Sequence, residues 1–300
     1  MRRNRFAAWG LGCGLLCLLG ADDVASRHQK LETLLAEAWD FEMRTHPEDA
    51  TANYGDYRYN DKLNDWSLSG AKNLADGRRA LFLRLRAIDA AGLSKEDRLN
   101  HELLSRSLRE QLAAYELKLH ELPIDPLDGF QIRPADLVKG SPFRNAKDYE
   151  DYLVRMRDLP RAFDQVIELA RAGIRDGLVP LKYLLDKVVK QAEAMTTPGP
   201  EHVFMQPVRA FPAGISELEQ QRLRAAVQAS IAQHIVPAYK KFAAFVRDEY
   251  TKKGRDAPSV ESLPNGAAIY RHYIRHYTTT ELLPEQIHAL GIKEDRKSVV

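Results

Sequence analysis

The sequence contains very little cysteine. Its two cysteines, Cys13 and Cys17, both lie among the first 21 of its 300 residues. Beyond residue 21 there is no cysteine, which excludes a disulfide framework and a cysteine-based metal site from that part of the chain. Lipid attachment also fits poorly, because Cys17 follows Leu16 rather than a small residue. Cys13 has Gly10 three positions earlier, where a branched apolar residue is needed.

The first 21 residues have the layout of a secretory signal peptide. Arg2, Arg3 and Arg5 precede an uncharged stretch, 6–20, and cleavage is predicted after Ala21. The stretch is shorter than the roughly 20 apolar residues that a membrane-spanning helix needs. The pattern therefore predicts a periplasmic or secreted protein that keeps no membrane contact after cleavage.

An excess of one charge is also missing. Removing the three arginines of the leader lowers the Lys and Arg count from 44 to 41, against 42 Asp and Glu. The net charge then falls from +2 to −1, and no separate basic patch stands out. Nucleic acid is accordingly not an expected partner.

Short runs of alternating β-branched and aromatic residues are absent too, so little sheet is expected. The sequence predicts a mainly α, multi-helix protein with two long irregular loops, 123–142 and 196–214, both rich in proline and glycine. Ser94, Asn145 and Ser216 are positioned as helix N-caps. Apolar residues recur at helical spacing in the segments 31–46, 74–92, 99–115, 146–176, 181–195 and 219–250.

The segment 263–291 is the most informative part of the chain. It predicts a helix over 266–277, a polar link at Thr278, Thr279 and Thr280, and a second helix from Pro284 to Gly291. We interpret this unit as the wall of a cleft. His276 and the three threonines are the predicted substrate-proximal residues, because they offer donors and acceptors to a peptide backbone. Core packing is the expected role of the tyrosines in the first helix, Tyr270, Tyr273 and Tyr277.

His272 and His276 are four residues apart, which is a zinc-ligand spacing on a helix. Tyr273 stands where a His-Glu-x-x-His motif has its glutamate, and Arg275 adds positive charge beside the pair. We therefore predict that neither histidine binds metal and that both border a cleft or the surface. No complete catalytic constellation is present, so no catalytic residue is assigned.

The block LPNGAAIYRHYIRHYTTTELLPEQIHALG resembles the shared block of the bacterial family named domain of unknown function 885. The segments GDYRYNDKLNDWS and GIRDGLVPLKYLLDKVVKQ agree with it in order and spacing, which extends the resemblance over nearly all of the chain after the leader. Members of that family resemble helical zinc carboxypeptidases and oligopeptidases with a His-Glu-x-x-His helix. The resemblance implies a zinc ion that polarises a peptide carbonyl and activates water.

In that family the zinc motif follows the shared block, and nothing in this chain matches it. We expect residues 22–294 to be the N-terminal portion of a zinc-metallopeptidase-like domain and 295–300 to be a non-native tail. The chain itself is then inactive and holds no cofactor, while zinc and a peptide substrate belong to the full-length relative. The alternative is a non-enzymatic helical binding or scaffold protein of the cell envelope, for which the chain is complete.

Overall fold

A computed structural model describes residues 23–298, with side chains through residue 295, and the predicted signal peptide lies outside this range. The mainly α prediction is confirmed, since residues 23–298 form eleven α-helices and no strand. None of these helices combines the length and apolar character that a membrane span requires. The helices are α1 (Val24–Thr45), α2 (Pro47–Tyr54), α3 (Leu68–Arg86), α4 (Lys95–Glu116), α5 (Asp136–Gly140), α6 (Ala146–Asp176), α7 (Lys182–Ala194), α8 (Glu217–Ser230), α9 (Val236–Phe245), α10 (Gly266–Thr278) and α11 (Pro284–Ser298).

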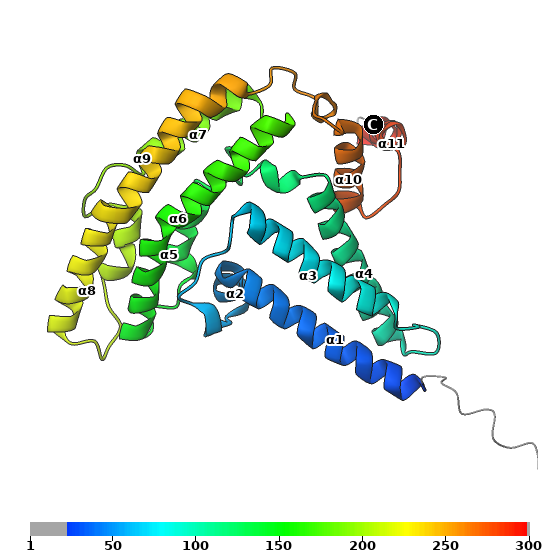
Figure 1. Cartoon of the computed structure of the whole chain (residues 1–300), viewed down its shortest axis with the longest axis horizontal. Helices are drawn as coiled ribbons and strands as arrows, with labels where there is room; N and C mark the ends of the chain where they lie inside the picture. Colours follow the sequence, from blue (N-terminus) through cyan, green and yellow to red (C-terminus); the bar gives the residue numbers. More distant parts are fainter. Residues whose placement is uncertain (1–22, 299–300) are drawn as a thin grey trace, which may run out of the picture.

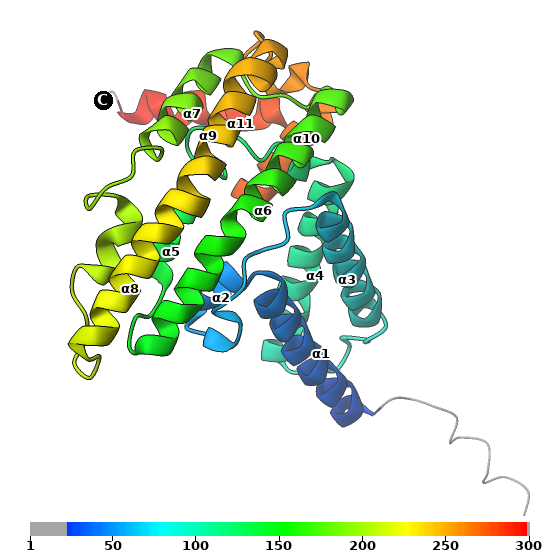
Figure 2. The ribbon, with the colours of Figure 1, turned by 60° about the vertical axis from the view of Figure 1, so that its left-hand side comes forward.

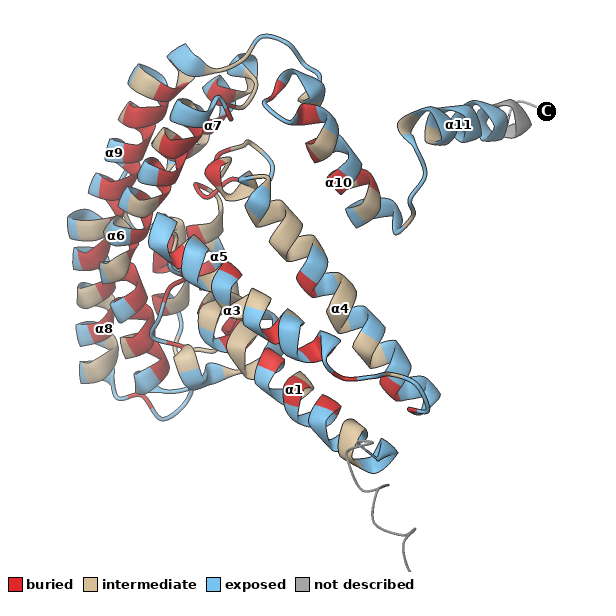
Figure 3. Ribbon diagram, turned by 45° about the vertical axis from the view of Figure 1, so that its right-hand side comes forward, coloured by how far each residue is buried: buried red, intermediate tan, exposed pale blue. Residues whose placement is uncertain are grey.

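The helices form two layers (Figures 1 and 2). The larger layer consists of α6, α7, α8 and α9, whose facing sides form the main hydrophobic core. The second layer consists of α1, α3 and α4, which enclose a separate small core. Helix α10 follows at the far end of α4, and α11 projects beyond it, with most of residues 284–295 exposed (Figure 3).

The predicted helix starts are confirmed at three places. Ser94 accepts from the Asp97 backbone N–H at 3.0 Å, and Asn145 accepts from the Asp148 N–H at 3.2 Å. Ser216 caps α8 in the same way. Each cap satisfies a backbone donor that the first turn of a helix leaves without a partner.

Two predictions about helix boundaries are wrong. The loop 123–142 contains one regular helix, α5, although its prolines predicted none. Helix α11 does not end at Gly291 but continues to Ser298. A helical glycine costs only about 1 kcal/mol relative to alanine. Gly291 also has open space around its Cα, so nothing at this position forces the helix to stop.

The long helix predicted over 219–250 is one continuous rod with two wider turns. Its α-helical parts, α8 and α9, are separated by a π-helical turn, Ile231–Ile235, and a second π turn follows at Val246–Tyr250. The first lies directly before Pro237. Proline lacks a backbone N–H, and its ring clashes with the preceding turn. A wider turn accommodates both the missing donor and the ring.

The side chain of Arg155 fastens α2 and the following loop to α6. It is only 1% exposed. Its Nε donates to the Lys62 carbonyl at 2.8 Å, and one Nη donates to the Pro47 carbonyl and to Thr51 Oγ1, both at 2.9 Å. Burial lowers the pKa of Arg155, but a guanidinium stays charged in proteins. The charge is thus stabilised by backbone and hydroxyl oxygens rather than by water.

Glu42 of α1 joins α1 to α3. Arg78 Nε and one Nη donate to its two oxygens, each at 3.1 Å, and His46 Nδ1 lies 3.0 Å from Oε2. Burial alone would raise the pKa of Glu42. The bonds from His46 and Arg78 outweigh burial and lower the pKa to about 2.

We expect Arg155→Met to lower the free energy of unfolding by about 3 kcal/mol or more, because the Lys62 carbonyl, the Pro47 carbonyl and the Thr51 hydroxyl each lose a hydrogen bond from a buried guanidinium. Urea unfolding monitored by circular dichroism measures the change. Arg157→Met is the matched control on the same helix, since exposed Arg157 bonds only to Leu153 within α6, and it should stay within about 0.5 kcal/mol. Equal unfolding midpoints for the two variants would contradict the assigned role of Arg155.

The ion pair at Glu42 predicts a pH-dependent stability. Its pKa is lower in the folded than in the unfolded chain, so its contribution is present above about pH 4.5 and is lost as the pH falls toward 2. The stability difference between the wild type and Glu42→Gln should therefore shrink by up to about 3 kcal/mol over that window. Urea titrations at each pH measure it. Glu37→Gln, which breaks the exposed pair with Arg84 between the same helices, should show little change.

Candidate functional site: the groove between α4 and α10

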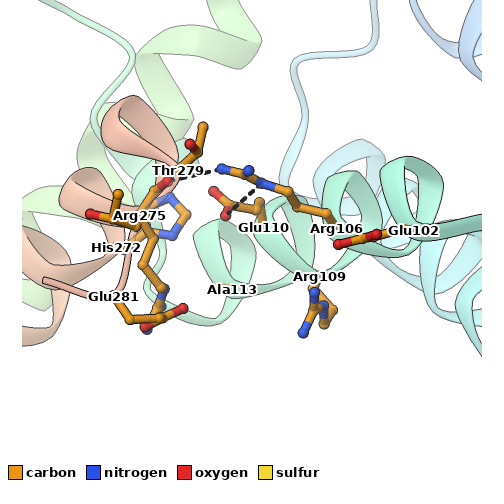
Figure 4. Close-up of a pocket in the computed structure, with 10 residues that line it drawn as sticks. Glu102, Arg106, Arg109, Glu110, Ala113, His272, Arg275, Thr279 and Glu281 are labelled. Atoms are coloured by element: carbon orange, nitrogen blue, oxygen red, sulfur yellow. Dashed lines mark hydrogen bonds and ion pairs between the residues drawn. The ribbon is translucent and has the colours of Figure 1, made fainter. Parts of the chain in front are cut away.

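Two adjoining cavities lie between α4 and α10, with volumes of about 430 and 470 Å³. Both are lined by Arg106, Glu110 and His272, so the pair of cavities forms one groove (Figure 4). Glu102, Arg109, Ala113, Arg275, Thr279, Thr280 and Glu281 complete the first cavity. Leu103, Ser107, Gln111, Ala114, Tyr273, His276 and Tyr277 complete the second.

Helical spacing explains which side chains enter the groove. Glu102, Arg106 and Glu110 are each four residues apart and share one face of α4, and His272 and His276 share one face of α10. One hydrogen bond joins the two faces, from Arg106 Nη to the Arg275 carbonyl at 3.1 Å. The Arg275 carbonyl, which also accepts from the Thr279 N–H, lies in the last turn of α10, an end that favours cations.

Three buried side-chain atoms of groove residues lack a hydrogen-bond partner among the residues that the structure describes: Glu110 Oε2, Gln111 Oε1 and His272 Nδ1. His272 is only 5% exposed and its Nδ1 is unpaired. Glu110 Oε2 is also buried without a hydrogen bond, although His276 Nδ1 lies 3.4 Å away. Figure 4 shows the His272 ring and the Glu110 carboxylate pointing toward one another. A buried polar atom without a partner costs about 1–3 kcal/mol, so this pair marks a site built to receive a ligand atom.

The environment of His272 keeps its imidazole neutral. Burial lowers the pKa of His272, and this effect outweighs the nearby Glu110 carboxylate, which raises it. A neutral imidazole has one nitrogen that donates and one that accepts. His272 therefore enters the groove as a hydrogen-bonding group without charge.

The structure distributes the predicted substrate-proximal residues over the groove. Thr279 and Thr280 line the first cavity and His276 lines the second. Thr278 lines neither, because its hydroxyl donates to the Ile274 carbonyl at 2.7 Å and accepts from the Thr280 N–H. Thr279 has a φ of +60° and closes the C-terminal end of α10, in agreement with the predicted polar link. Contact of these residues with a substrate stays a prediction.

The expectation for the tyrosines of α10 is wrong for two of the three. Tyr277 is 76% exposed and Tyr270 is 39% exposed, whereas Tyr273 packs against a small apolar cluster. The buried side chains of α10 are instead Ile269, His272 and Ile274. The side of α10 that is buried against the rest of the chain therefore contains His272, with Tyr273 half-buried beside it.

The zinc ion implied for full-length relatives does not fit this groove. The rings of His272 and His276 are stacked with centroids 6.1 Å apart, and no third ligand atom comes within reach of both. Within residues 23–298, three ligand atoms converge only at His28, Glu32 and Asp97, which lie about 20 Å from Glu110 along α4. His28 and Asp97 already form an ion pair there at 3.0 Å. A closed tetrahedral zinc site needs four ligands, and the groove does not supply them.

Sequence reasoning missed Arg106, Glu110 and the burial of His272. The residues of α4 lie about 160 positions before α10, and no local pattern connects the two segments. The one available signal was the row of charged residues on a single face of α4. Such a row is normally interpreted as a solvated helix face.

The buried state of His272 is directly measurable. We expect its imidazole to titrate below the ordinary value of 6.5, because burial disfavours the imidazolium. Since the unfolded chain then binds this proton more readily, the free energy of unfolding should fall as the pH drops below about 6.5. Proton NMR of the histidine rings, with His272→Gln for assignment and the urea-unfolded chain as reference, measures the pKa. Titration at or above 6.5 in the folded chain would contradict the burial.

Comparison with known proteins gives a structural relative and a family. The chain matches a crystal structure described as that of the “putative lipoprotein from Colwellia psychrerythraea”, with a TM-score of 0.82 and 19% identity, over 91% of this chain and 50% of that one. It thus spans about half the length of this solved relative, and the likeness shows the fold alone. No curated protein matches the chain. The profile described as “Bacterial protein of unknown function (DUF885)” matches residues 47–298, and the chain therefore belongs to the DUF885 family.

Proposed function

We propose that this chain supplies the peptide-binding wall of an extracytoplasmic, zinc-metallopeptidase-like protein. The observation that carries the proposal is that two buried polar atoms, His272 Nδ1 and Glu110 Oε2, make no hydrogen bond in a groove between two helices. A peptide backbone alternates N–H donors and C=O acceptors. It can therefore form hydrogen bonds with both the acceptors and the donors that line such a groove. Pockets with a few convergent polar groups are the preferred ligand sites of folded proteins.

The rim of the groove supplies donors for peptide carbonyl groups. Arg109 and Arg275 make no ion pair in the part of the chain that the structure describes, so their guanidinium groups are available to a ligand. The hydroxyl groups of Thr279 and Thr280 lie at the same cavity. In this proposal the arginines and threonines orient the peptide, while His276 contacts it from the second cavity.

Peptide-bond hydrolysis would be an activity of the full-length relative, with zinc held by residues outside this groove. The chain alone is expected to be inactive. A periplasmic or secreted location is supported by the leader sequence and by the description of the solved relative as a lipoprotein. A non-enzymatic scaffold protein of the cell envelope would use the same groove for binding without hydrolysis.

Peptide binding is testable with the purified chain. We expect tetra-alanine to bind, and Thr279→Val to weaken binding about 3- to 10-fold, because valine keeps the shape of threonine but removes one hydrogen-bonding group. Isothermal titration calorimetry measures the dissociation constants. Thr33→Val on α1, far from the groove, should leave the affinity unchanged. Absence of binding to the wild-type chain would overturn the proposal.

The proposed zinc-dependent hydrolysis is tested by comparing this chain with a full-length relative. A full-length relative should contain about one zinc ion per chain and hydrolyse short peptides, while the present chain should do neither. Metal analysis by mass spectrometry and a peptide-cleavage assay on both proteins measure this. A full-length relative without zinc would remove the peptidase assignment and leave the scaffold alternative.

A further inference from the structure

The groove between α4 and α10 separates its charges by depth. Glu110 and His272 form the floor, with the Glu110 side chain 18% exposed and His272 buried. Arg109, Glu102 and Glu281 are exposed and form the rim. Figure 4 shows Arg109 directed away from the floor pair. The floor of the groove therefore holds one carboxylate and one imidazole, while the rim carries exposed groups of both charges.

The negative charge of Glu110 is only partly compensated by its neighbours. Arg106 lies 3.7 Å from Oε1 and directs one Nη to the Arg275 carbonyl instead. His276 lies 3.4 Å from Oε2 without a hydrogen bond, and its side chain is 55% exposed. The C-terminal end of α10 adds partial negative charge at the same place. A cation with several N–H donors would satisfy these groups together.

We infer that Glu110 and His272 bind an alkylammonium group, supplied by the free α-amino group of a peptide. An ammonium has three donors and one positive charge in a small volume. One donor would reach Glu110 Oε2, and a second would reach an unprotonated His272 Nδ1. A backbone amide N–H offers only one donor and no charge. The peptide would then extend toward Thr279, Thr280 and the arginines of the rim.

This inference rests on the proposed peptide binding and adds the end of the peptide that is recognised. Charge-assisted hydrogen bonds are roughly twice as strong as neutral ones, so blocking the amine should have a large effect. An ammonium could also come from a lysine side chain. The test therefore separates the peptide terminus from the side chain.

Calorimetry with three probes tests the inference on the full chain: tetra-alanine, N-acetyl-tetra-alanine, and an N-acetyl tetrapeptide with one lysine. We expect acetylation of tetra-alanine to weaken binding at least tenfold, and the lysine peptide to bind as weakly as the acetylated one. Glu110→Gln should weaken binding of the free-amine peptide by a similar factor and leave the acetylated peptide unchanged. That unchanged affinity also shows that the variant is folded. Glu116→Gln is the matched control on the same helix, because Glu116 pairs with Arg79 outside the groove.

The outcomes distinguish this inference from the proposed function. Equal affinity for free and acetylated tetra-alanine would overturn the ammonium site, while the groove would remain a peptide site. Tight binding of the lysine peptide would keep the ammonium site but overturn the α-amino group as its source. Wild-type affinity for tetra-alanine in Glu110→Gln would overturn the role of Glu110. If no probe binds, the proposed function fails and this inference fails with it.

Discussion

The buried guanidinium of Arg155 joins the larger helical layer to the segment that connects α1 with α3. It bonds to the Pro47 carbonyl, Thr51 and the Lys62 carbonyl, and thereby attaches α2 and the following loop to α6. A second bond, from the Trp66 N–H to Gln165 on α6, holds the far end of that loop. The loop begins and ends against one helix, so the directions in which α1 enters and α3 leaves are fixed. The groove depends on this arrangement because it places α4, the partner of α3, beside α10.

Fewer interactions hold α4 and α10 together at the groove than hold the helices of the main core together. Arg106 provides the one hydrogen bond found between the described parts of α4 and α10, and much of the surrounding surface is exposed. The aromatic side chains near its second cavity, such as Tyr277, are on the solvent side. Buried acceptors without partners are costly in a folded protein, and here they lie where two helices are held apart. A groove with exposed surroundings and with buried polar atoms that lack hydrogen bonds is typical of a ligand-binding surface.

The solved relative shows the fold of this chain, but neither it nor family membership shows which reaction or ligand the chain serves. At 19% identity the match shows that the helices follow the same arrangement. The relative is about twice as long as the matched part, so an activity of the whole protein does not transfer to this half by likeness. Function depends on particular groups in the groove. Glu110 and His272 carry the binding proposal.

The sequence alone determined the elements that depend on local interactions. Apolar spacing specified the helices, and Ser94, Asn145 and Ser216 specified their starts, because a cap acts within one turn. It also specified the polar link that follows α10 at Thr279 and Thr280. Its errors lie where a local signal is weak, as at Gly291, where a glycine penalty of about 1 kcal/mol does not end a helix.

Only the tertiary structure decided which face of α10 is buried and what it meets. The histidines and tyrosines of α10 have similar helical spacing, so periodicity could not tell which of them would face α4. That choice depends on packing between segments about 160 residues apart, which the buried Arg155 and the α3–α4 pair bring together. Glu110 and His272 line one groove, and hence form the candidate binding site, only after those long-range contacts have formed.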